Sequence, residues 1–372
     1  MEIHREDPSV VRRYASHLAD LPGEALTAVS QREGARILRL APQGGVPIDV
    51  LDLSTLSTTG TFKDCVACVS TARAARGGHR VAAAQSSGNT ANALAAYAPR
   101  AGLRLVALHP PASRGRVLPH LAHHPAVTFV EVDAPEDEIK RLLREATAAA
   151  DVPALPPLRD QIDANSLRAH YLYDAMDALG DRWHWHVQAL SSAYGPFGFY
   201  HGWQAATNGS HGSSAAPPRF LGVQQEAVAP YAEALGAAPA PDSRPMLEPT
   251  LFRRTLTPDL ADRMRRLCRQ THGTVRRLPN DRYLHWEPRA IRLLEQVGIP
   301  LTRDPDGTPR ERAGLYSLAG TLEAVTTGLI PEGQRVLVVY TGGSGPAADT
   351  YTPHHSVTAD QAPALLKRLL TA

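Results

Sequence analysis

The sequence predicts an α/β fold in which mostly parallel sheets are flanked by helices. Three observations support this prediction. Short apolar segments typical of buried strands occur at residues 80–84, 103–108, 127–132 and 335–340. Segments with helical character separate them, and polar or glycine-rich loops follow several of the strands. Strands and helices that alternate at this spacing are typical of parallel sheets covered by helices on both faces.

The individual elements follow from local signals. A helix is expected from Lys63 to residue 75, where Gly77-Gly78 is a good stop signal. A second is expected over residues 90–101 and a third after Asp133, whose acidic first turn suits the helix dipole. Other expected elements are helices at 165–179 and 314–327, strands at 186–191 and 219–223, and loops at 207–218 and 236–249.

Composition excludes several classes of protein. The chain has 372 residues and a formal net charge of +2, without a basic tract interleaved with aromatics, so neither nucleic acid nor a membrane is an expected partner. No apolar run approaches the roughly 18 residues that a membrane span needs. The charged N-terminus lacks the apolar core of a signal peptide, and 3 cysteines cannot form a disulfide framework. We therefore expect a cytoplasmic protein.

Cysteine and histidine patterns do not predict a metal site. Cys65 and Cys68 form one C-x-x-C pair, which also fits two small apolar residues one turn apart on a helix. No second such pair accompanies it. His123-His124 and His354-His355 are adjacent pairs, and adjacent residues on a strand point to opposite faces. We expect no bound metal.

The lysine content singles out Lys63. Of the 39 basic residues only Lys63, Lys140 and Lys367 are lysine. Arginine stays protonated and cannot form an imine with an aldehyde, whereas a desolvated lysine can. Lys63 is therefore a candidate for covalent chemistry.

Three polar loops follow predicted strands, where ligands of open α/β sheets bind. The first is Ser86-Ser87-Gly88-Asn89-Thr90, between a strand and a helix. The second is Tyr194-Gly195-Pro196-Phe197-Gly198, whose glycines suit backbone N–H groups wrapped around a phosphate. The third begins with Thr341-Gly342-Gly343. Each loop alone also fits plain turn chemistry.

A phosphorylated aldehyde cofactor accounts for the loops and the lysine together. The sequence has no Gly-Lys-Ser/Thr phosphate motif, and no G-x-G-x-x-G opens a helix with an acidic partner downstream. An isolated lysine, a phosphate cradle and two further polar loops indicate pyridoxal 5'-phosphate.

These motifs resemble those of fold-type II pyridoxal phosphate enzymes, the tryptophan synthase β superfamily, and are most similar to those of threonine synthases. Residues 59–64, Thr-Gly-Thr-Phe-Lys-Asp, resemble the Thr-Gly-Ser-Phe-Lys-Asp segment of threonine synthases. The run from Ser86 to Ala91 is similar to the family's asparagine loop, and Gly195–Gly198 to its Gly-Asn-x-Gly phosphate loop. Thr341 stands where the family places a Ser or Thr. The resemblance covers roughly residues 50–345.

The resemblance implies a role for each residue. Lys63 would hold the cofactor as a Schiff base and then act as the base for the substrate's Cα proton. Asn89 would contact the ring oxygen, Thr341 the pyridine nitrogen, and Gly195, Pro196, Phe197 and Gly198 the phosphate. The substrate carboxylate would be held by the asparagine loop, through Ser86, Ser87, Gly88 and Thr90.

The resemblance also implies an architecture. A smaller α/β domain of residues 48–160 would carry Lys63 and Asn89. A larger one, residues 1–47 plus 161–372, would carry the phosphate loop and Thr341, with the cofactor in the cleft between the domains. Family members are commonly dimers, so a homodimer is a possible assembly.

Departures from the family make the substrate harder to predict than the cofactor. Cys65 replaces the arginine usual in threonine synthases, and Pro196 removes one N–H donor from the phosphate loop. We expect a threonine synthase-like lyase or synthase, in specialised amino-acid biosynthesis, that performs β- or γ-elimination or replacement on an activated serine or homoserine. The alternatives are threonine synthase itself, a threonine or serine dehydratase-like deaminase, and a non-catalytic relative that kept the fold.

Overall fold

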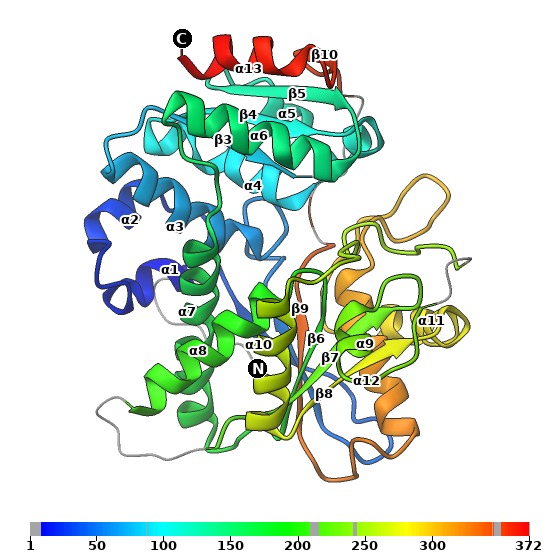
Figure 1. Ribbon diagram of the computed structural model, residues 1–372. Coiled ribbons are helices and arrows are strands. Elements are labelled where there is room, and N and C mark those ends of the chain that lie inside the picture. The colour runs from blue at the N-terminus through cyan, green and yellow to red at the C-terminus, as the bar shows by residue number, and fades with distance from the viewer. Residues whose placement is uncertain are drawn as a thin grey trace. The chain divides into compact units, whose positions relative to one another are not determined.

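The computed structural model describes residues 9–86, 88–208, 216–240, 244–343, 345 and 351–371 (Figure 1). They form two compact units, each described by itself below. Unit 1 contains Gly34–Leu56 and Asn165–Gly345, and unit 2 contains Ser9–Glu33, Ser57–Ala164 and residues 351–371. Both units consist of a mostly or wholly parallel sheet with packed helices, which confirms the predicted α/β class.

Unit 1 is built on a six-stranded sheet with the order β1-β2-β9-β6-β7-β8. Its strands are β1 (Arg36–Arg39), β2 (Ile48–Asp52), β6 (Trp185–Ala189), β7 (Arg219–Gln225), β8 (Thr274–Leu278) and β9 (Val336–Tyr340). β1 pairs antiparallel with β2, and every other pair is parallel. The carboxyl ends of five strands therefore meet at one edge of this sheet.

Helices cover both sides of the unit 1 sheet (Figure 1). They are α8 (Tyr194–Asn208), α9 (Pro230–Ala234), α10 (Pro258–Thr271), α11 (Asn280–Gln296) and α12 (Ala313–Thr326), and α7 (Leu158–Leu179) enters from unit 2. Figure 1 shows α8 and α10 on one side of the strands and α12 on the other. The sequence predicted α7 only from residue 165, but it begins seven residues earlier.

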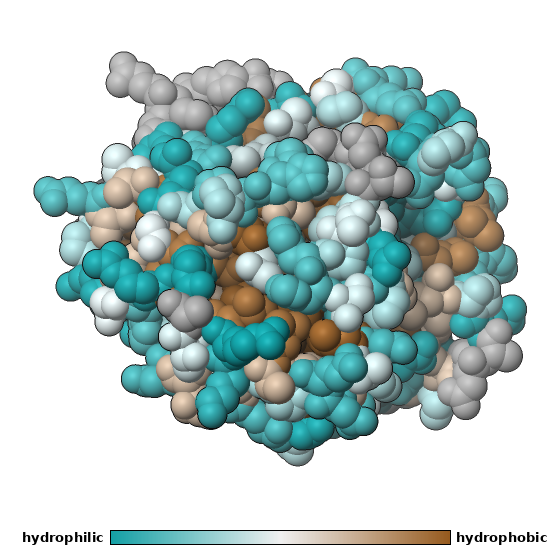
Figure 2. Space-filling model, turned by 90° about the horizontal axis from the view of Figure 1, so that it is seen from above, coloured by the Kyte–Doolittle hydropathy of each residue, from teal (hydrophilic) through white to brown (hydrophobic). Residues whose placement is uncertain are grey.

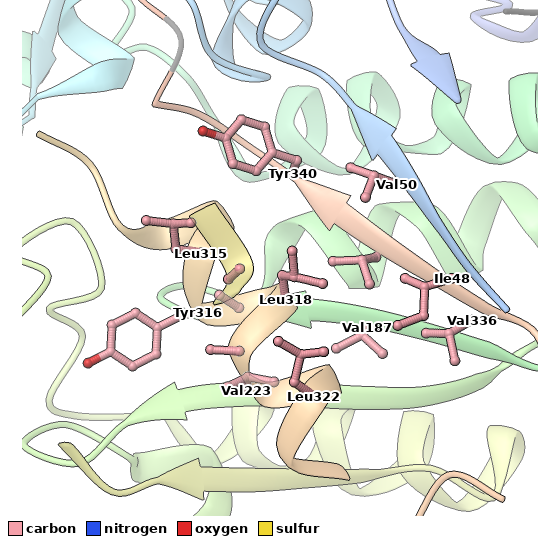
Figure 3. Close-up of a cluster of buried hydrophobic side chains, with 14 of the residues drawn as sticks. Ile48, Val50, Val187, Val223, Leu315, Tyr316, Leu318, Leu322, Val336 and Tyr340 are labelled. Carbon is pink, nitrogen blue, oxygen red and sulfur yellow. The ribbon is translucent and has the colours of Figure 1, made fainter. Parts of the chain in front are cut away.

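The core of unit 1 lies between α12 and the sheet. Figure 3 shows Leu318 and Leu322 of α12 beside Val187 of β6 and Ile48 of β2. α12 approaches closely because it carries small residues. A Cβ on Gly314 would overlap the ring of Tyr340. This packing fixes the end of β9, from which the third polar loop departs.

Unit 2 is built on a four-stranded, wholly parallel sheet with the order β10-β5-β4-β3. The strands are β3 (Val81–Gln85), β4 (Arg104–His109), β5 (Val127–Asp133) and β10 (His355–Thr358). The helices are α1 (Val10–Arg13), α2 (Gly23–Val29), α3 (Lys63–Arg76), α4 (Asn89–Tyr97), α5 (Pro119–Ala122), α6 (Glu136–Ala150) and α13 (Ala362–Thr371). The predicted helix over 90–101 is α4 followed by a 3-10 turn at Pro99–Ala101.

The two ends of the described chain lie in unit 2, whereas the sequence led us to expect them in the other domain. Tertiary contacts explain the difference. α1 and α2 pack on α3, and the Val10 amide donates to the Glu33 carbonyl at 3.0 Å. At the other end β10 pairs with β5, and α13 packs on α6. Neither contact has a local sequence signal.

Hydrophilic residues predominate on the molecular face seen in Figure 2. Within the ranges that the structure describes, no helix combines the length and apolarity needed to cross a bilayer.

Candidate active site

Lys63 is the first residue of α3 in unit 2. Its side chain is half-buried, and its Nζ lies 4.5 Å from the centre of the Phe62 ring. Its amide donates to Thr61 Oγ1 at 3.3 Å. The helix runs to Arg76, as predicted from the Gly77-Gly78 stop signal. Lys63 thus stands at a fixed point on a rigid element, as covalent catalysis requires.

The turn before Lys63 is held by a buried carboxyl group, which sequence analysis did not single out. Asp64 is 0 % exposed and accepts hydrogen bonds from the Thr59 amide (2.9 Å) and the Thr59 hydroxyl (2.5 Å). Burial raises the pKa of Asp64 to about 7, although the bonds from Thr59 act in the opposite direction. Gly60, at φ +74°, supplies the left-handed residue of the turn.

The asparagine loop joins β3 to α4 in the same unit. Asn89 and Thr90 open α4 and are half-buried, and Gly88 is the buried N-cap residue. Ser86 Oγ accepts a hydrogen bond from the Gly88 amide at 3.2 Å. Ser87, predicted to bind the substrate carboxylate, lies outside the described residues. The structure therefore brings Ser86, Gly88, Asn89 and Thr90 together at a helix N-terminus.

The predicted phosphate loop forms the start of α8 in unit 1. Gly195, Pro196 and Gly198 are buried and Phe197 is half-buried, all within the first turns of the helix. Pro196 is tolerated because the first amides of a helix have no intrahelical acceptor. The residue before Tyr194 is Ala193, whose φ of +60° is unusual for a residue with a Cβ. The loop therefore enters α8 through a strained turn.

Arg168 of α7 supports this loop, and sequence analysis missed it. Its guanidinium is buried and donates to the Gly195 carbonyl at 2.8 Å. A signal was available, because Arg168 is spaced four residues from both Ala164 and Leu172 and so shares their apolar helix face. An arginine on the apolar face of a helix is rarely buried unless it has a partner, so this pattern indicates a structural or functional role.

Gln188 of β6 completes the support for the loop. A Cβ on Gly195 would lie 2.5 Å from Gln188 Nε2 and 3.2 Å from Arg168 Nη2, so any larger residue would displace these two side chains. Gln188 is buried, and its Oε1 has no hydrogen-bond partner among the described residues. A buried polar atom without a hydrogen-bond partner destabilises the folded state unless a water molecule or a ligand supplies the missing bond.

The third loop begins at the end of β9, also in unit 1. Thr341 is buried and directly follows Tyr340, the last residue of β9. The Glu311 carboxylate lies against the next residue, because a Cβ on Gly342 would overlap it. Glu311 belongs to the segment 311–317, which precedes and opens α12.

The unit 1 residues fit a bound phosphate. The first amides of α8 and the helix dipole favour an anion, and the buried Arg168 adds positive charge behind the loop. The glycine at 195 lets the backbone come close to a ligand. This donor set matches the phosphate of pyridoxal phosphate.

The thiols of the C-x-x-C pair are unsuited to redox chemistry. Cys65 and Cys68 are both buried in α3. Burial raises the pKa of the Cys68 thiol well above its ordinary value, so the reactive thiolate is disfavoured. Across the described ranges there is no group of three or more His, Cys, Asp or Glu side chains able to hold a metal ion.

A lysine at the N-terminus of α3 and a glycine-containing helix start supported by Arg168 are compatible with the pyridoxal phosphate enzymes. Comparison with known sequences agrees. Residues 35–342 match the pyridoxal-phosphate dependent enzyme family, to which this chain belongs. The protein is therefore a pyridoxal phosphate-dependent enzyme, as its lysine and loops predicted.

Similar sequences include threonine synthases. The chain is 26% identical to threonine synthase from Mycobacterium leprae over 360 residues, covering 93% of this chain and 91% of that protein. It is 25% identical to threonine synthase from Methanosarcina acetivorans over 311 residues, covering 82% and 72% of the two chains.

Solved structures confirm the fold. Maize serine racemase has a TM-score of 0.62 at 15% identity, covering 86% of this chain and 92% of that chain. Threonine deaminase from T.th. has a TM-score of 0.57 at 17% identity, with coverage of 83% and 90%. O-ureido-L-serine synthase has a TM-score of 0.58 at 16% identity, with coverage of 86% and 91%. The fold-type II architecture is therefore established.

Proposed function

We propose that this enzyme is a lyase or synthase that performs β- or γ-elimination or replacement on a small amino acid with a leaving group, such as an activated serine or homoserine. The observation that carries the proposal is the uncharged hydroxyl of Thr341 at the end of β9, in a chain of the pyridoxal phosphate family. A hydroxyl at the pyridine nitrogen does not enforce ring protonation. This favours elimination and replacement over transamination.

The residues to which the proposal assigns roles are taken unit by unit. Lys63 and Asn89 come from unit 2, and Gly195, Gly198 and Thr341 from unit 1. Lys63 would hold the cofactor covalently through its amine. The amides at the start of α8 bind the phosphate, in a loop kept in place by the Arg168 hydrogen bond. Pro196 and Phe197 shape that loop without adding charge.

The substrate is held and deprotonated by residues of unit 2. The loop of Ser86, Ser87, Gly88 and Thr90 binds the substrate carboxylate near the N-terminus of α4. Lys63, once its amine is free, accepts the proton from the substrate Cα. When bound, pyridoxal phosphate supplies the electron sink for this step.

Threonine synthase proper is a second candidate, favoured by the similarity to two threonine synthases. Against it stands Cys65, a buried thiol where threonine synthases usually have arginine. A threonine or serine deaminase is a third candidate, and the T.th. threonine deaminase is among the similar structures. A non-catalytic relative is disfavoured, because Lys63 and the three loops are intact.

A substrate panel distinguishes these candidates. Purified holoenzyme and a Lys63→Ala control are incubated with O-phosphohomoserine, O-acetylserine, serine and threonine. Release of phosphate or acetate by the wild type alone supports elimination or replacement. Conversion of phosphohomoserine to threonine identifies threonine synthase, and ammonia from threonine or serine without an added nucleophile identifies a deaminase. If wild type and Lys63→Ala behave alike on every substrate, the proposed function is wrong.

A further inference from the structure

We propose that Asp64 is a positioning residue, which fixes the turn of residues 58–62 and so presents the Lys63 amine from the N-terminus of α3. The inference deepens the proposed function and rests on Lys63 as the cofactor lysine. Asp64 makes no contact with cofactor or substrate in this proposal. It acts through Thr59.

Both carboxylate oxygens of Asp64 are used by one residue of the turn. Oδ2 accepts from the Thr59 amide at 2.9 Å, and Oδ1 accepts from the Thr59 hydroxyl at 2.5 Å. Asp64 and Thr59 are both buried, so water cannot easily replace either bond. The pair closes a ring between the first turn of α3 and a residue five positions earlier.

Other hydrogen bonds hold the two ends of the turn. The Thr58 amide donates to the Arg32 carbonyl at 3.0 Å, and the Lys63 amide donates to Thr61 Oγ1 at 3.3 Å. The turn also contains Gly60, the most permissive residue for backbone motion. Without the Asp64 carboxyl group, the centre of the segment that precedes Lys63 would lose both hydrogen bonds that hold Thr59.

Glu33 and Tyr97 are titratable groups next to Asp64, and neither hydrogen-bonds to Thr59. Glu33 is also buried, but its carboxylate accepts from the hydroxyls of Ser9 and Ser30 and from the Gln31 amide, each at 2.5 Å. Tyr97 Oη lies 3.5 Å from Thr58 Oγ1 and also faces both carboxyl groups. Glu33 therefore organises the segment before residue 34, and Asp64 organises the turn before Lys63.

The chain offers a matched control for the test. Asp306 Oδ1 accepts from the Thr308 amide at 2.9 Å and the Thr308 hydroxyl at 2.6 Å, which is the same chemistry as the Asp64–Thr59 pair. Asp306 is exposed and lies in unit 1, in a segment without a predicted site residue. Asp306→Asn should leave the Lys63 turn unchanged.

Amide hydrogen exchange of the cofactor-free protein tests the role directly. Asp64→Asn should speed exchange at residues 58–62 by tenfold or more, with α6 and α13 unchanged. Thr59→Val keeps the amide bond and loses the hydroxyl bond, so a smaller increase is expected. Thr59→Ser, which keeps the hydroxyl, should restore exchange close to the wild-type rate. When the cofactor-free Asp64→Asn and Thr59→Val variants are mixed with pyridoxal phosphate, they should also bind it on Lys63 more slowly than the wild type.

The possible outcomes distinguish a failure of the positioning role of Asp64 from a failure of the proposed function. If exchange at residues 58–62 is unchanged in Asp64→Asn, the positioning role is wrong whatever the enzyme catalyses. If Asp64→Asn does not fold, the Thr59→Val and Thr59→Ser pair decides, and identical exchange in the two variants overturns the role. If borohydride reduction of the wild-type holoenzyme never attaches the cofactor to Lys63, the proposed function is wrong, while the hydrogen-exchange result still applies to the turn.

Discussion

Replacing Arg168 with methionine tests how the phosphate loop is built. The guanidinium is 2 % exposed and donates to the Gly195 carbonyl at 2.8 Å, within the first turns of α8. Methionine fills much of the same space without the charge or the hydrogen bond. The variant should therefore bind pyridoxal phosphate more weakly, while the residues of unit 2 stay unaffected.

The magnitude follows from the loss of one buried, charge-assisted hydrogen bond. Such bonds contribute about 1.5–3 kcal/mol. At roughly 1.4 kcal/mol per factor of ten, the dissociation constant for the cofactor should rise by up to about 100-fold, the limit being reached when the whole loss falls on the loop conformation that binds the phosphate. Arg168→Lys keeps the charge but loses the planar fork, so an intermediate loss is expected.

Equilibrium titration of the apoprotein with pyridoxal phosphate, followed by visible absorbance, measures the effect. Thermal unfolding of the apoprotein checks that the variant folds. Arg269→Met, which removes an exposed arginine from the last turn of α10, is the control and should bind as the wild type does. An Arg168→Met protein that folds and binds the cofactor as tightly as the wild type would refute the reasoning.

Three further predictions test neighbouring features. Gly195→Ala should weaken cofactor binding by about tenfold or more in the same titration, because the added Cβ would lie 2.5 Å from Gln188 Nε2; unchanged binding would contradict the cradle. Ala193→Gly should raise the free energy of unfolding by about 0.5–1 kcal/mol in urea denaturation, because it relieves a φ of +60°; a destabilised variant would show that the turn is not strained. Burial raises the pKa of Asp64 in the folded state to about 7, above its ordinary value of 3.8. Between these two pH values the folded protein keeps a proton on Asp64 that the unfolded chain loses, so the free energy of unfolding falls as the pH rises from about 4 to 7. Asp64→Asn should remove up to about 4 kcal/mol of that dependence, and parallel stability–pH curves for the two proteins would count against it.

Local patterns were sufficient to predict much of the fold and of the site. The Gly77-Gly78 pair marked the end of α3, and the apolar run before Thr341 is β9. Lys63 was conspicuous because arginine carries nearly all other positive charge. These signals lie within a few residues of the feature they predict, so no tertiary information was needed.

Features that depend on distant contacts could not be read from the chain. Residues 9–33 join unit 2 because they pack on α3 and α4, for example through Gln31 Nε2 and the Ala96 carbonyl at 2.8 Å. Arg168 precedes Gly195 by 27 residues, and only the crossing of α7 with α8 brings them together. The sequence showed that Asp64 follows Lys63, but not that Asp64 accepts a hydrogen bond from Thr59, five residues earlier, because that contact depends on how the turn folds.

Borohydride reduction of the holoenzyme tests the central claim most directly. The visible absorbance of the purified protein should disappear on reduction, and peptide sequencing should find the cofactor on Lys63. The chain contains only two other lysines, Lys140 and Lys367, so the assignment is unambiguous. Cofactor attached to either of these two, or to none, would contradict the account.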